Sequence, residues 1–166
     1  QRASSLLRSW AGVRHRELML VLVLDDALGG EEVVERSPDQ SLFTRRCTDA
    51  AIDFIERHKD ERFFVYLAHP MPHRPIHASE PWVGSSELGL YGDVLQELDD
   101  SVGRILDALA ALGLEEETLV VFTSDNGPWR PESTGGLRGK KNTTWEGGVR
   151  VPLLFRLPGR IPAGRT

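Results

Sequence analysis

The chain has 166 residues, a formal net charge of -5, 40% hydrophobic residues and 27% charged residues. This size accommodates one domain or a piece of a larger one, and the composition is that of an ordinary globular protein. The acidic balance excludes a general electrostatic attraction to nucleic acid or to anionic membranes. We therefore expect no nucleic-acid partner, and any site for an anion has to be local.

Residues 1–46 predict an irregular leader with one apolar strand. Residues 1–17 mix Arg and Ser without a clean period, whereas residues 18–24 are continuously apolar and predict a buried strand. The stretch 31–40 is acidic and contains the loop signal Ser37-Pro38-Asp39. The apolar strand is about a third of the ~20 residues that cross a bilayer, so we expect no membrane span.

The middle of the chain predicts a helix, a strand and a second, longer helix. Residues 48–58 favour a helix that Thr48 caps and that basic residues close. Residues 62–68 carry the aromatic and β-branched side chains of a strand, and prolines stop it. Between residues 88 and 112 apolar residues recur every three or four positions, which predicts one amphipathic helix ended by Gly113.

The C-terminal part predicts two further strands separated by a long glycine-rich loop. The strands cover residues 118–123 and 151–155, and the loop runs to Gly148. Alternation of strands and helices predicts an α/β fold with a mainly parallel (mixed) sheet flanked by helices. Functional groups gather beyond the strand ends of such sheets, where both His73 and Asp125 are expected.

A metal-binding motif follows the predicted strand 118–123. In the sequence Ser124-Asp125-Asn126-Gly127, Asp125 and Asn126 present side-chain oxygens, which are the ligands that calcium and magnesium prefer. A plain turn is the alternative, because Asp-Asn-Gly is also strong turn chemistry. The strand before this motif and the lysine motif after it favour the metal site.

Paired lysines stand in the glycine-rich loop, in the run from Gly139 to Gly148. The ammonium group of Lys141 could neutralise an anionic group bound beside the cation, with Lys140 as the competitor for this role. A solvated loop lysine is the alternative. Together the two motifs predict a metal-plus-lysine site for a phosphate or sulfate ester.

Five ordered motifs between Thr48 and Pro162 resemble the later part of a sulfatase catalytic domain, in particular the arylsulfatase A and N-acetylgalactosamine-6-sulfatase group. They are Phe63-Phe64-Val65-Tyr66-Leu67-Ala68, Pro72-His73-Arg74-Pro75, Leu98-Asp99-Asp100-Ser101-Val102-Gly103, Ser124-Asp125-Asn126-Gly127 and Lys141-Asn142-Thr143-Thr144-Trp145-Glu146-Gly147-Gly148. The resemblance implies that residues 47–166 are a partial sulfatase catalytic domain of alkaline-phosphatase-like fold. Because such domains are longer and Gln1 is not a methionine, we expect a piece of a longer protein.

The resemblance also implies a chemistry, namely calcium-dependent hydrolysis of sulfate esters with a formylglycine nucleophile. The expected substrate is a sulfated small molecule or glycan, and the expected location is secreted, periplasmic or lysosomal. By the same resemblance Asp125 and Asn126 bind the metal, and Lys141 and His73 contact the sulfate, with His73 as the candidate general acid. Asp25 and Asp26, which follow the apolar strand, resemble two further calcium ligands in outline, but their register is imperfect.

The nucleophile of that family is missing from this chain. Formylglycine is made from cysteine in a Cys-x-Pro-x-Arg sequence, whereas the only cysteine, Cys47, is followed by Thr48, Asp49, Ala50 and Ala51. We therefore expect this polypeptide alone to be inactive. Two alternatives stay open: a metal-dependent phosphatase or phosphodiesterase of the same superfamily, and a noncatalytic metal- or anion-binding fragment.

Two other clusters are predicted to carry no chemistry. His69, His73 and His77 recur every four residues, but the prolines between them exclude a zinc-binding helix. Asp99 and Asp100 stand on the side of the predicted long helix that is not apolar, so a solvated structural role is favoured over acid-base catalysis.

Overall fold

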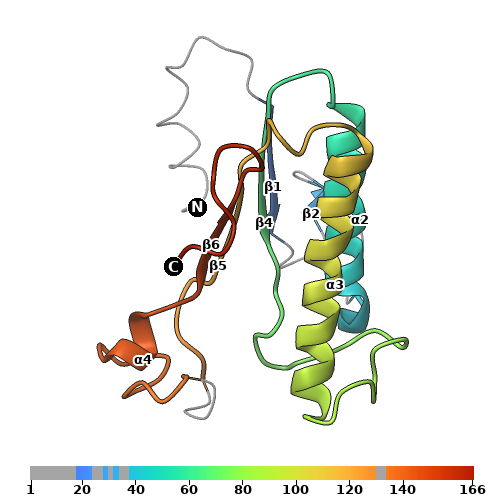
Figure 1. Cartoon of the computed structure of the whole chain (residues 1–166). Helices are drawn as coiled ribbons and strands as arrows, with labels where there is room; N and C mark the ends of the chain where they lie inside the picture. Colours follow the sequence, from blue (N-terminus) through green and yellow to red (C-terminus); the bar gives the residue numbers. More distant parts are fainter. Residues whose placement is uncertain (1–17, 24–27, 30–31, 34–37, 130–133) are drawn as a thin grey trace. The chain divides into compact units, whose positions relative to one another are not determined.

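A computed structural model of the chain describes residues 18–23, 28–29, 32–33, 38–129 and 134–166 (Figure 1). Contacts divide the chain into two compact units, unit 1 (residues 1–112) and unit 2 (residues 113–166), and each is described by itself. This division does not test the predicted boundary between residues 46 and 47, which stays a prediction. Among the described residues, no helix is long and apolar enough to cross a membrane.

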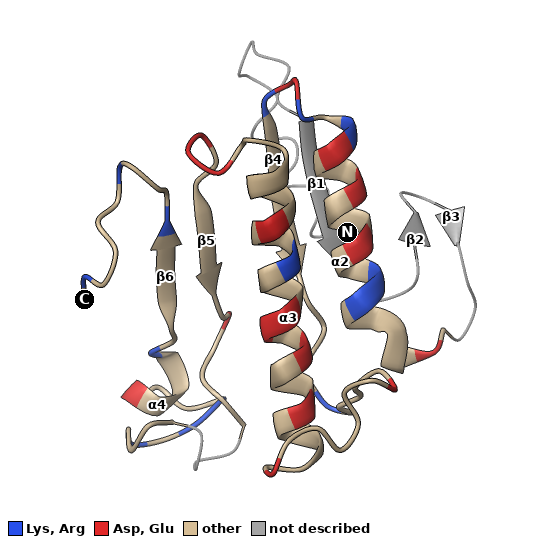
Figure 2. Ribbon diagram, turned by 45° about the vertical axis from the view of Figure 1, so that its right-hand side comes forward, with Lys and Arg blue, Asp and Glu red and all other residues tan. Residues whose placement is uncertain are grey.

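Unit 1 contains a parallel pair of strands and two long helices. β1 (Leu18–Val23) runs parallel to β4 (Phe63–Ala68), with Val23 opposite Ala68 where both strands end. A short antiparallel pair, β2 (Leu28–Gly29) and β3 (Glu32–Val33), lies between them in the chain. α2 (Phe43–Arg57) packs on β1 and β4, and α3 (Leu90–Ala111) lies beside α2 (Figure 1, Figure 2).

The first long helix begins earlier than predicted. The short 3-10 helix η1 (Gln40–Leu42) leads directly into α2, and Asp39 caps η1 by accepting a hydrogen bond from the Ser41 backbone N–H at 3.0 Å. Thr48, predicted to cap the helix, is instead buried within it and donates its hydroxyl to the Thr44 carbonyl oxygen at 2.7 Å. The prediction was wrong because the helix begins at Phe43, within the segment 1–46 that the sequence predicts to be an irregular leader.

The other predicted elements of unit 1 are confirmed to within two residues. The strand predicted over residues 62–68 is β4, and the helix predicted between residues 88 and 112 is α3. α3 ends at Ala111, and Gly113, two residues later, has a φ of 70°, a left-handed conformation that glycine adopts without strain. The prolines after β4 lead into a loop whose residues Met71 and Ala78 form a small core with Val94 of α3.

α3 buries a stripe of polar side chains in addition to apolar ones. Asp93, Glu97 and Ser101 are four residues apart and are 2%, 4% and 2% exposed. The Asp93 carboxylate accepts hydrogen bonds from the backbone N–H groups of Gly84 and Ser86, at 2.9 and 2.8 Å. The stripe therefore fastens the preceding loop to the helix, as buried polar groups require partners.

Unit 2 is an antiparallel strand pair with a long loop between its strands. β5 (Val120–Thr123) pairs with β6 (Leu153–Arg156), so that Thr123 lies opposite Leu153. The loop contains one unpredicted turn of helix, α4 (Glu146–Val149). An ion pair of 2.9 Å between Arg156 and Glu115 ties the end of β6 to the segment before β5.

The strands of the described residues form three two-stranded sheets and not one mainly parallel sheet. Only the β1–β4 pair is parallel, while the β2–β3 and β5–β6 pairs are antiparallel. The α/β composition is confirmed, but the mainly parallel arrangement is not what the structure has. Antiparallel pairing of β5 with β6 is consistent with the described part of the loop between them, residues 124–129 and 134–152, which contains no crossover helix that would bring the chain back in the same direction.

Candidate active site

Asp125 and Asn126 lie directly after β5. The Thr123 hydroxyl donates to the Pro152 carbonyl oxygen at 3.0 Å and the Ser124 hydroxyl donates to the Asn126 carbonyl oxygen at 3.1 Å, which define the turn that follows the strand. Asp125 is exposed, and none of the hydrogen bonds or ion pairs among the described residues uses its carboxylate. Its oxygens are therefore available to a ligand.

Glycines bring this turn into direct contact with the lysine loop. The Gly127 backbone N–H donates to the Gly148 carbonyl oxygen at 2.9 Å. A Cβ atom on Gly127 would collide with the Gly147 carbonyl oxygen, and a Cβ atom on Gly148 would collide with that of Thr143. Only glycine allows backbones to approach so closely, so these glycines hold the Asp125 turn against the lysine loop.

Lys141 stands at the corner of a tight turn. The Thr143 N–H donates to the Lys140 carbonyl oxygen at 3.1 Å, and Asn142 between them has a φ of 69°. The Thr143 hydroxyl fixes the same turn, since it donates to the Lys140 carbonyl oxygen at 2.7 Å and accepts from the Lys140 N–H at 3.1 Å. The Lys141 N–H donates to the Pro128 carbonyl oxygen at 2.8 Å. Lys141 is thus bonded through its backbone to a residue two positions after Asn126.

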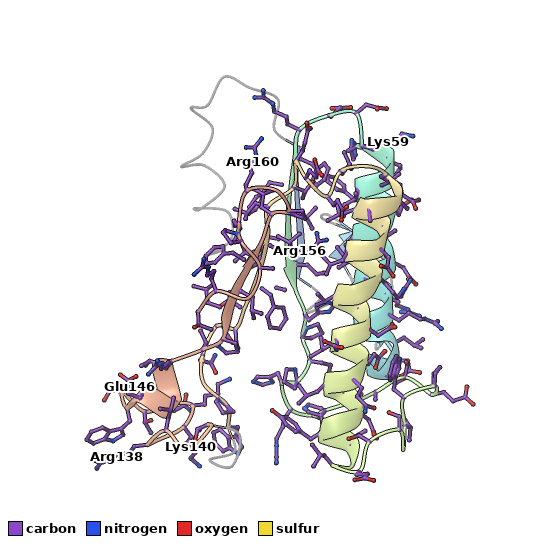
Figure 3. The ribbon with its side chains drawn as sticks, viewed as in Figure 1. Lys59, Arg138, Lys140, Glu146, Arg156 and Arg160 are labelled. Carbon is purple, nitrogen blue, oxygen red and sulfur yellow. The ribbon has the colours of Figure 1, made fainter. Side chains whose placement is uncertain are left out.

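The two neighbouring lysines have different surroundings. The Lys140 ammonium lies 4.8 Å from the ring centroid of Trp129, in a cation–π contact. The Lys141 ammonium has no such partner among the described residues. This difference favours Lys141 over Lys140 for the role of anion-binding lysine that the sequence left open. A second cation–π contact joins Arg138 to Trp145 at 3.4 Å, and Figure 3 labels Arg138, Lys140 and Glu146 beside α4.

His73 lies in unit 1, on the exposed loop after β4. Its Nδ1 is 2.8 Å from the Arg74 carbonyl oxygen. Because a carbonyl oxygen can only accept, Nδ1 carries the proton in the neutral ring and Nε2 carries none. His73 therefore needs a second proton, on Nε2, before that atom can donate one to a leaving group.

The structure brings together three of the four predicted site residues. Asp125, Asn126 and Lys141 are joined within unit 2 by the backbone contacts described above. His73 belongs to unit 1, and its approach to the other three stays a prediction. Asp25 and Asp26 lie outside the described residues, after a strand that ends beside the end of β4.

The ligand atoms of the turn suit calcium in kind but not in number. Carboxylate and amide oxygens are calcium ligands, and the ion takes six to eight oxygens. The described residues contain no group of three or more His, Cys, Asp or Glu side chains that could hold a metal ion. Asp125 and Asn126 can therefore supply part of a calcium shell, and the remaining ligands have to come from water, substrate or other residues.

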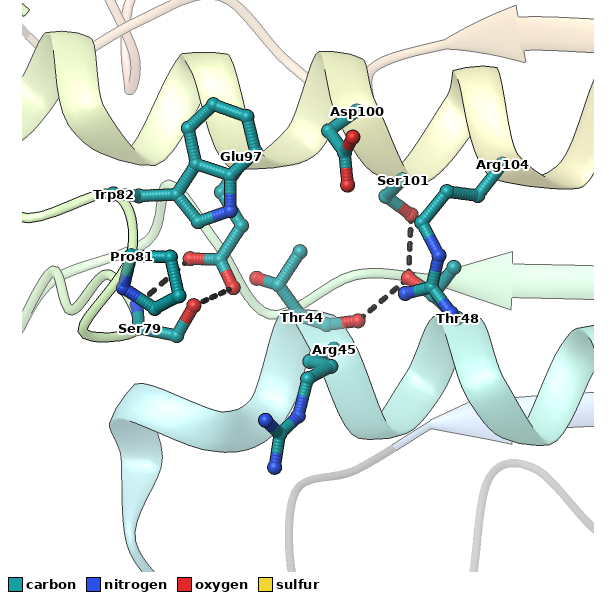
Figure 4. Close-up of a pocket in the computed structure, with 10 residues that line it drawn as sticks. All are labelled: Thr44, Arg45, Thr48, Ser79, Pro81, Trp82, Glu97, Asp100, Ser101 and Arg104. Carbon is teal, nitrogen blue, oxygen red and sulfur yellow. Dashed lines mark hydrogen bonds between the residues drawn. The ribbon is translucent and has the colours of Figure 1, made fainter. Parts of the chain in front are cut away.

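A buried carboxylate that sequence reasoning missed lines a cavity of about 80 Å³ in unit 1 (Figure 4). Both oxygens of Glu97 are occupied there, because Oε2 accepts from the Ser79 N–H at 2.9 Å and Oε1 accepts from the Ser79 hydroxyl at 2.8 Å. Its four-residue spacing from Asp93 and Ser101 was the available signal. The paired carboxylates Asp99 and Asp100 are exposed, as the solvated interpretation predicted.

A directed chain of hydrogen bonds crosses unit 1. The Thr48 hydroxyl donates to the Thr44 carbonyl oxygen, so it must accept from the Ser101 hydroxyl at 2.5 Å. Ser101 in turn accepts from Nε2 of His69 at 3.1 Å, which leaves Nδ1 of His69 buried without a partner in the described structure. Burial lowers the pKa of His69 to about 4 and keeps its ring neutral.

Cys47 is fully buried in α2. Burial raises the pKa of the Cys47 thiol to about 11, so almost none of it is thiolate at neutral pH. Arg45 and Arg46, which precede Cys47 in the chain, do not reverse this rise in the pKa of the thiol. Cys47 is therefore a packed core thiol and no substitute for a nucleophile.

Comparison with known proteins places these features in context. Residues 24–166 match the family model described as Sulfatase. The N-acetylgalactosamine-6-sulfatase of Canis lupus familiaris is 46% identical over 124 residues, which are 70% of this chain and 24% of that protein. The steryl-sulfatase of Mus musculus is 41% identical over 144 residues, which are 81% of this chain and 23% of that protein.

The fold is shared with a solved structure. The crystal structure of the PsFucS1 sulfatase from Pseudoalteromonas sp. matches with a TM-score of 0.76 and 32% sequence identity, over 82% of this chain and 30% of that chain. This match confirms an α/β fold of the same type. The chain spans about a quarter of the length of the curated relatives it matches.

Proposed function

Because the chain belongs to the sulfatase family, we propose that it carries part of a site that binds and hydrolyses sulfate esters. Asp125 and Asn126 hold a calcium ion in this proposal, and Lys141 holds the sulfate. The observation that supports it best is the backbone contact between the turn after β5 and the lysine loop, in which the Lys141 N–H donates to the Pro128 carbonyl oxygen at 2.8 Å.

Each residue has a distinct task in this proposal. A calcium ion held by Asp125 and Asn126 would supply positive charge for a bound sulfate group. The Lys141 ammonium neutralises a second sulfate oxygen and stabilises negative charge that develops as the S–O bond breaks. His73, once protonated on Nε2, gives that proton to the departing alcohol oxygen. His73 is included on the strength of the family resemblance, since it belongs to the other unit.

This polypeptide alone is expected to bind a sulfate ester without hydrolysing it. Hydrolysis requires a nucleophile to attack sulfur, and Cys47 is buried and lacks the Pro and Arg that formylglycine formation requires. Because the chain spans about a quarter of its curated relatives, catalysis is a proposal for the whole protein. The expected location, secreted, periplasmic or lysosomal, likewise stays a prediction.

Calcium binding tests the metal half of the proposal. Calorimetric titration of the purified chain should give a dissociation constant of about 1 mM, since an incomplete ligand set binds calcium weakly. Asp125→Ala should abolish the heat of binding, whereas Asp99→Ala, a change of an exposed carboxylate on α3, should not. Absence of binding at millimolar calcium would contradict the proposal.

Binding and turnover of sulfate esters test the other half. With calcium present, 4-nitrophenyl sulfate should bind to the chain, and Lys141→Ala should weaken this binding at least tenfold through loss of the charged contact. Lys59→Ala, a change of an exposed lysine in unit 1, is the matched control. Release of 4-nitrophenol above the rate of the Lys141→Ala variant would refute the predicted inactivity. Tighter binding of 4-nitrophenyl phosphate than of the sulfate would favour the phosphatase alternative.

A further inference from the structure

His73 stands on a short exposed loop that is fixed to α3 on both sides. Before His73, Met71 is 5% exposed and forms a buried cluster with Val94 of α3. After it, Ser79 donates two hydrogen bonds to the carboxylate of Glu97 of α3, at 2.9 and 2.8 Å. His73 is therefore the accessible part of a loop whose flanks are buried.

The thioether of Met71 closes this loop at its base. The His77 backbone N–H donates to the Sδ atom of Met71 at 3.4 Å, so one side chain holds the backbone on both sides of His73. Because sulfur is a weak acceptor, most of the stabilisation comes from burial of the Met71 side chain against α3. Packing and hydrogen bond together keep the two sides of the loop at a constant separation.

Two hydrogen bonds inside the loop orient His73. Its backbone N–H donates to the Pro70 carbonyl oxygen at 3.0 Å, and its ring Nδ1 donates to the Arg74 carbonyl oxygen at 2.8 Å. The second bond selects the tautomer, because a carbonyl oxygen only accepts. A neutral imidazole released from this partner is free to carry its proton on Nε2 instead. The tautomer of His73 therefore depends on where the loop holds the Arg74 carbonyl group.

We propose that Met71 is a positioning residue for His73: by closing the base of the loop, it keeps the Arg74 carbonyl oxygen against Nδ1 and leaves Nε2 free to take up the proton that it transfers. Without this anchor the carbonyl group moves away from Nδ1 and the ring loses its fixed tautomer. Met71 touches no substrate and acts only through His73. The inference rests on the function proposed above, in which His73 protonates the departing alcohol oxygen.

Nuclear magnetic resonance of the histidine ring nitrogens tests this role on the full chain without any ligand. A ring nitrogen has a different chemical shift with and without its proton, and His73→Gln identifies the signals that belong to His73. At about pH 8, where an ordinary imidazole is neutral, the unaltered chain should carry the His73 proton on Nδ1. Met71→Ala should raise the ratio of the Nε2–H to the Nδ1–H form about fivefold, as expected for the loss of one hydrogen bond. It should also speed hydrogen exchange of the His77 amide about tenfold.

Three further variants separate positioning of His73 from a general loss of packing. Met71→Leu keeps a side chain of similar volume on α3 and should preserve the tautomer. Val94→Ala removes part of the surface on which Met71 packs, and it should shift the tautomer in the same direction as Met71→Ala but less. Leu109→Ala opens a cavity elsewhere in α3, since Leu109 is 1% exposed and lies outside the buried cluster that contains Met71. It should lower stability and leave the tautomer unchanged.

An unchanged tautomer in Met71→Ala or in Val94→Ala, or an equal shift in Leu109→Ala, would overturn the inference. The proposed function is decided separately, by binding of calcium and of 4-nitrophenyl sulfate to the chain. An unchanged tautomer beside retained binding would therefore refute the positioning role and leave the proposed function standing. A shifted tautomer in a chain that binds neither ligand would refute the proposed function, and with it the proton transfer assigned to His73.

Discussion

Protonation of His69 should destabilise unit 1 as the pH falls. The hydrogen-bond chain runs in one direction, from Nε2 of His69 through the hydroxyls of Ser101 and Thr48. A second proton would have to sit on Nδ1, which is buried and has no partner in the described structure. The folded protein therefore resists a proton that the unfolded chain accepts, and stability is lost in acid.

The magnitude follows from the two pKa values. Burial lowers the pKa of His69 from 6.5 to about 4. The stability that the folded protein has while His69 is neutral is therefore fully present above about pH 6.5 and is lost as the pH falls toward 4. The difference corresponds to about 3 kcal/mol in the free energy of unfolding, of which about 2 kcal/mol is lost between pH 7 and pH 5.

Urea unfolding at pH 7, 6 and 5 measures this loss. Circular dichroism at the helical band is a suitable signal, because α2 and α3 are the two long helices of the described structure and both lie in unit 1. His69→Gln keeps a donor toward Ser101 but does not titrate, so its stability should fall about 2 kcal/mol less than that of the unaltered chain between pH 7 and pH 5. His73→Gln, a change of an exposed histidine, is the control and should behave like the unaltered chain. Parallel pH profiles for His69→Gln and the unaltered chain would refute the reasoning.

Two further substitutions test close packing, one in each unit. Gly127→Ala places a Cβ against a backbone carbonyl, so it should lower the free energy of unfolding by about 1–3 kcal/mol and weaken calcium and sulfate binding together. The control is Gly103→Ala, in the open middle of α3, which should raise the free energy of unfolding by up to about 1 kcal/mol. Similar results for the two variants would contradict the close contact at Gly127. Glu97→Ala leaves the Ser79 donors unpaired and should cost about 2 kcal/mol in urea unfolding, whereas Asp99→Ala should stay within about 0.5 kcal/mol. Equal stability of these two variants would show that the buried hydrogen bonds contribute nothing.

Most elements could be predicted from the sequence because their patterns are local. The spacing of apolar residues predicted α3, and a run of aromatic and β-branched residues predicted β4. The start of α2 and the turn of α4 were missed, because neither has a side-chain cap to mark it. The parallel arrangement failed for β5 and β6, since hydrophobic pattern alone does not determine strand direction.

The candidate site was predictable in composition but not in geometry. The order of Asp125, Asn126 and Lys141 predicts a shared site, which stays a prediction, and the structure adds the backbone contacts that join the loops of these residues. Buried Glu97 was overlooked because a pattern search counts apolar residues, whereas its partner is a single serine eighteen residues earlier in the chain. The tryptophans were not singled out because an exposed aromatic residue leaves no periodic signal.

The glycine contact between the two loops has a consequence for how specificity can change. Gly127 and Gly148 meet through main-chain atoms alone, so the separation of the acidic turn from the lysine turn does not depend on neighbouring side chains. Side chains elsewhere in the two loops can therefore change while the main-chain contact between the loops is kept.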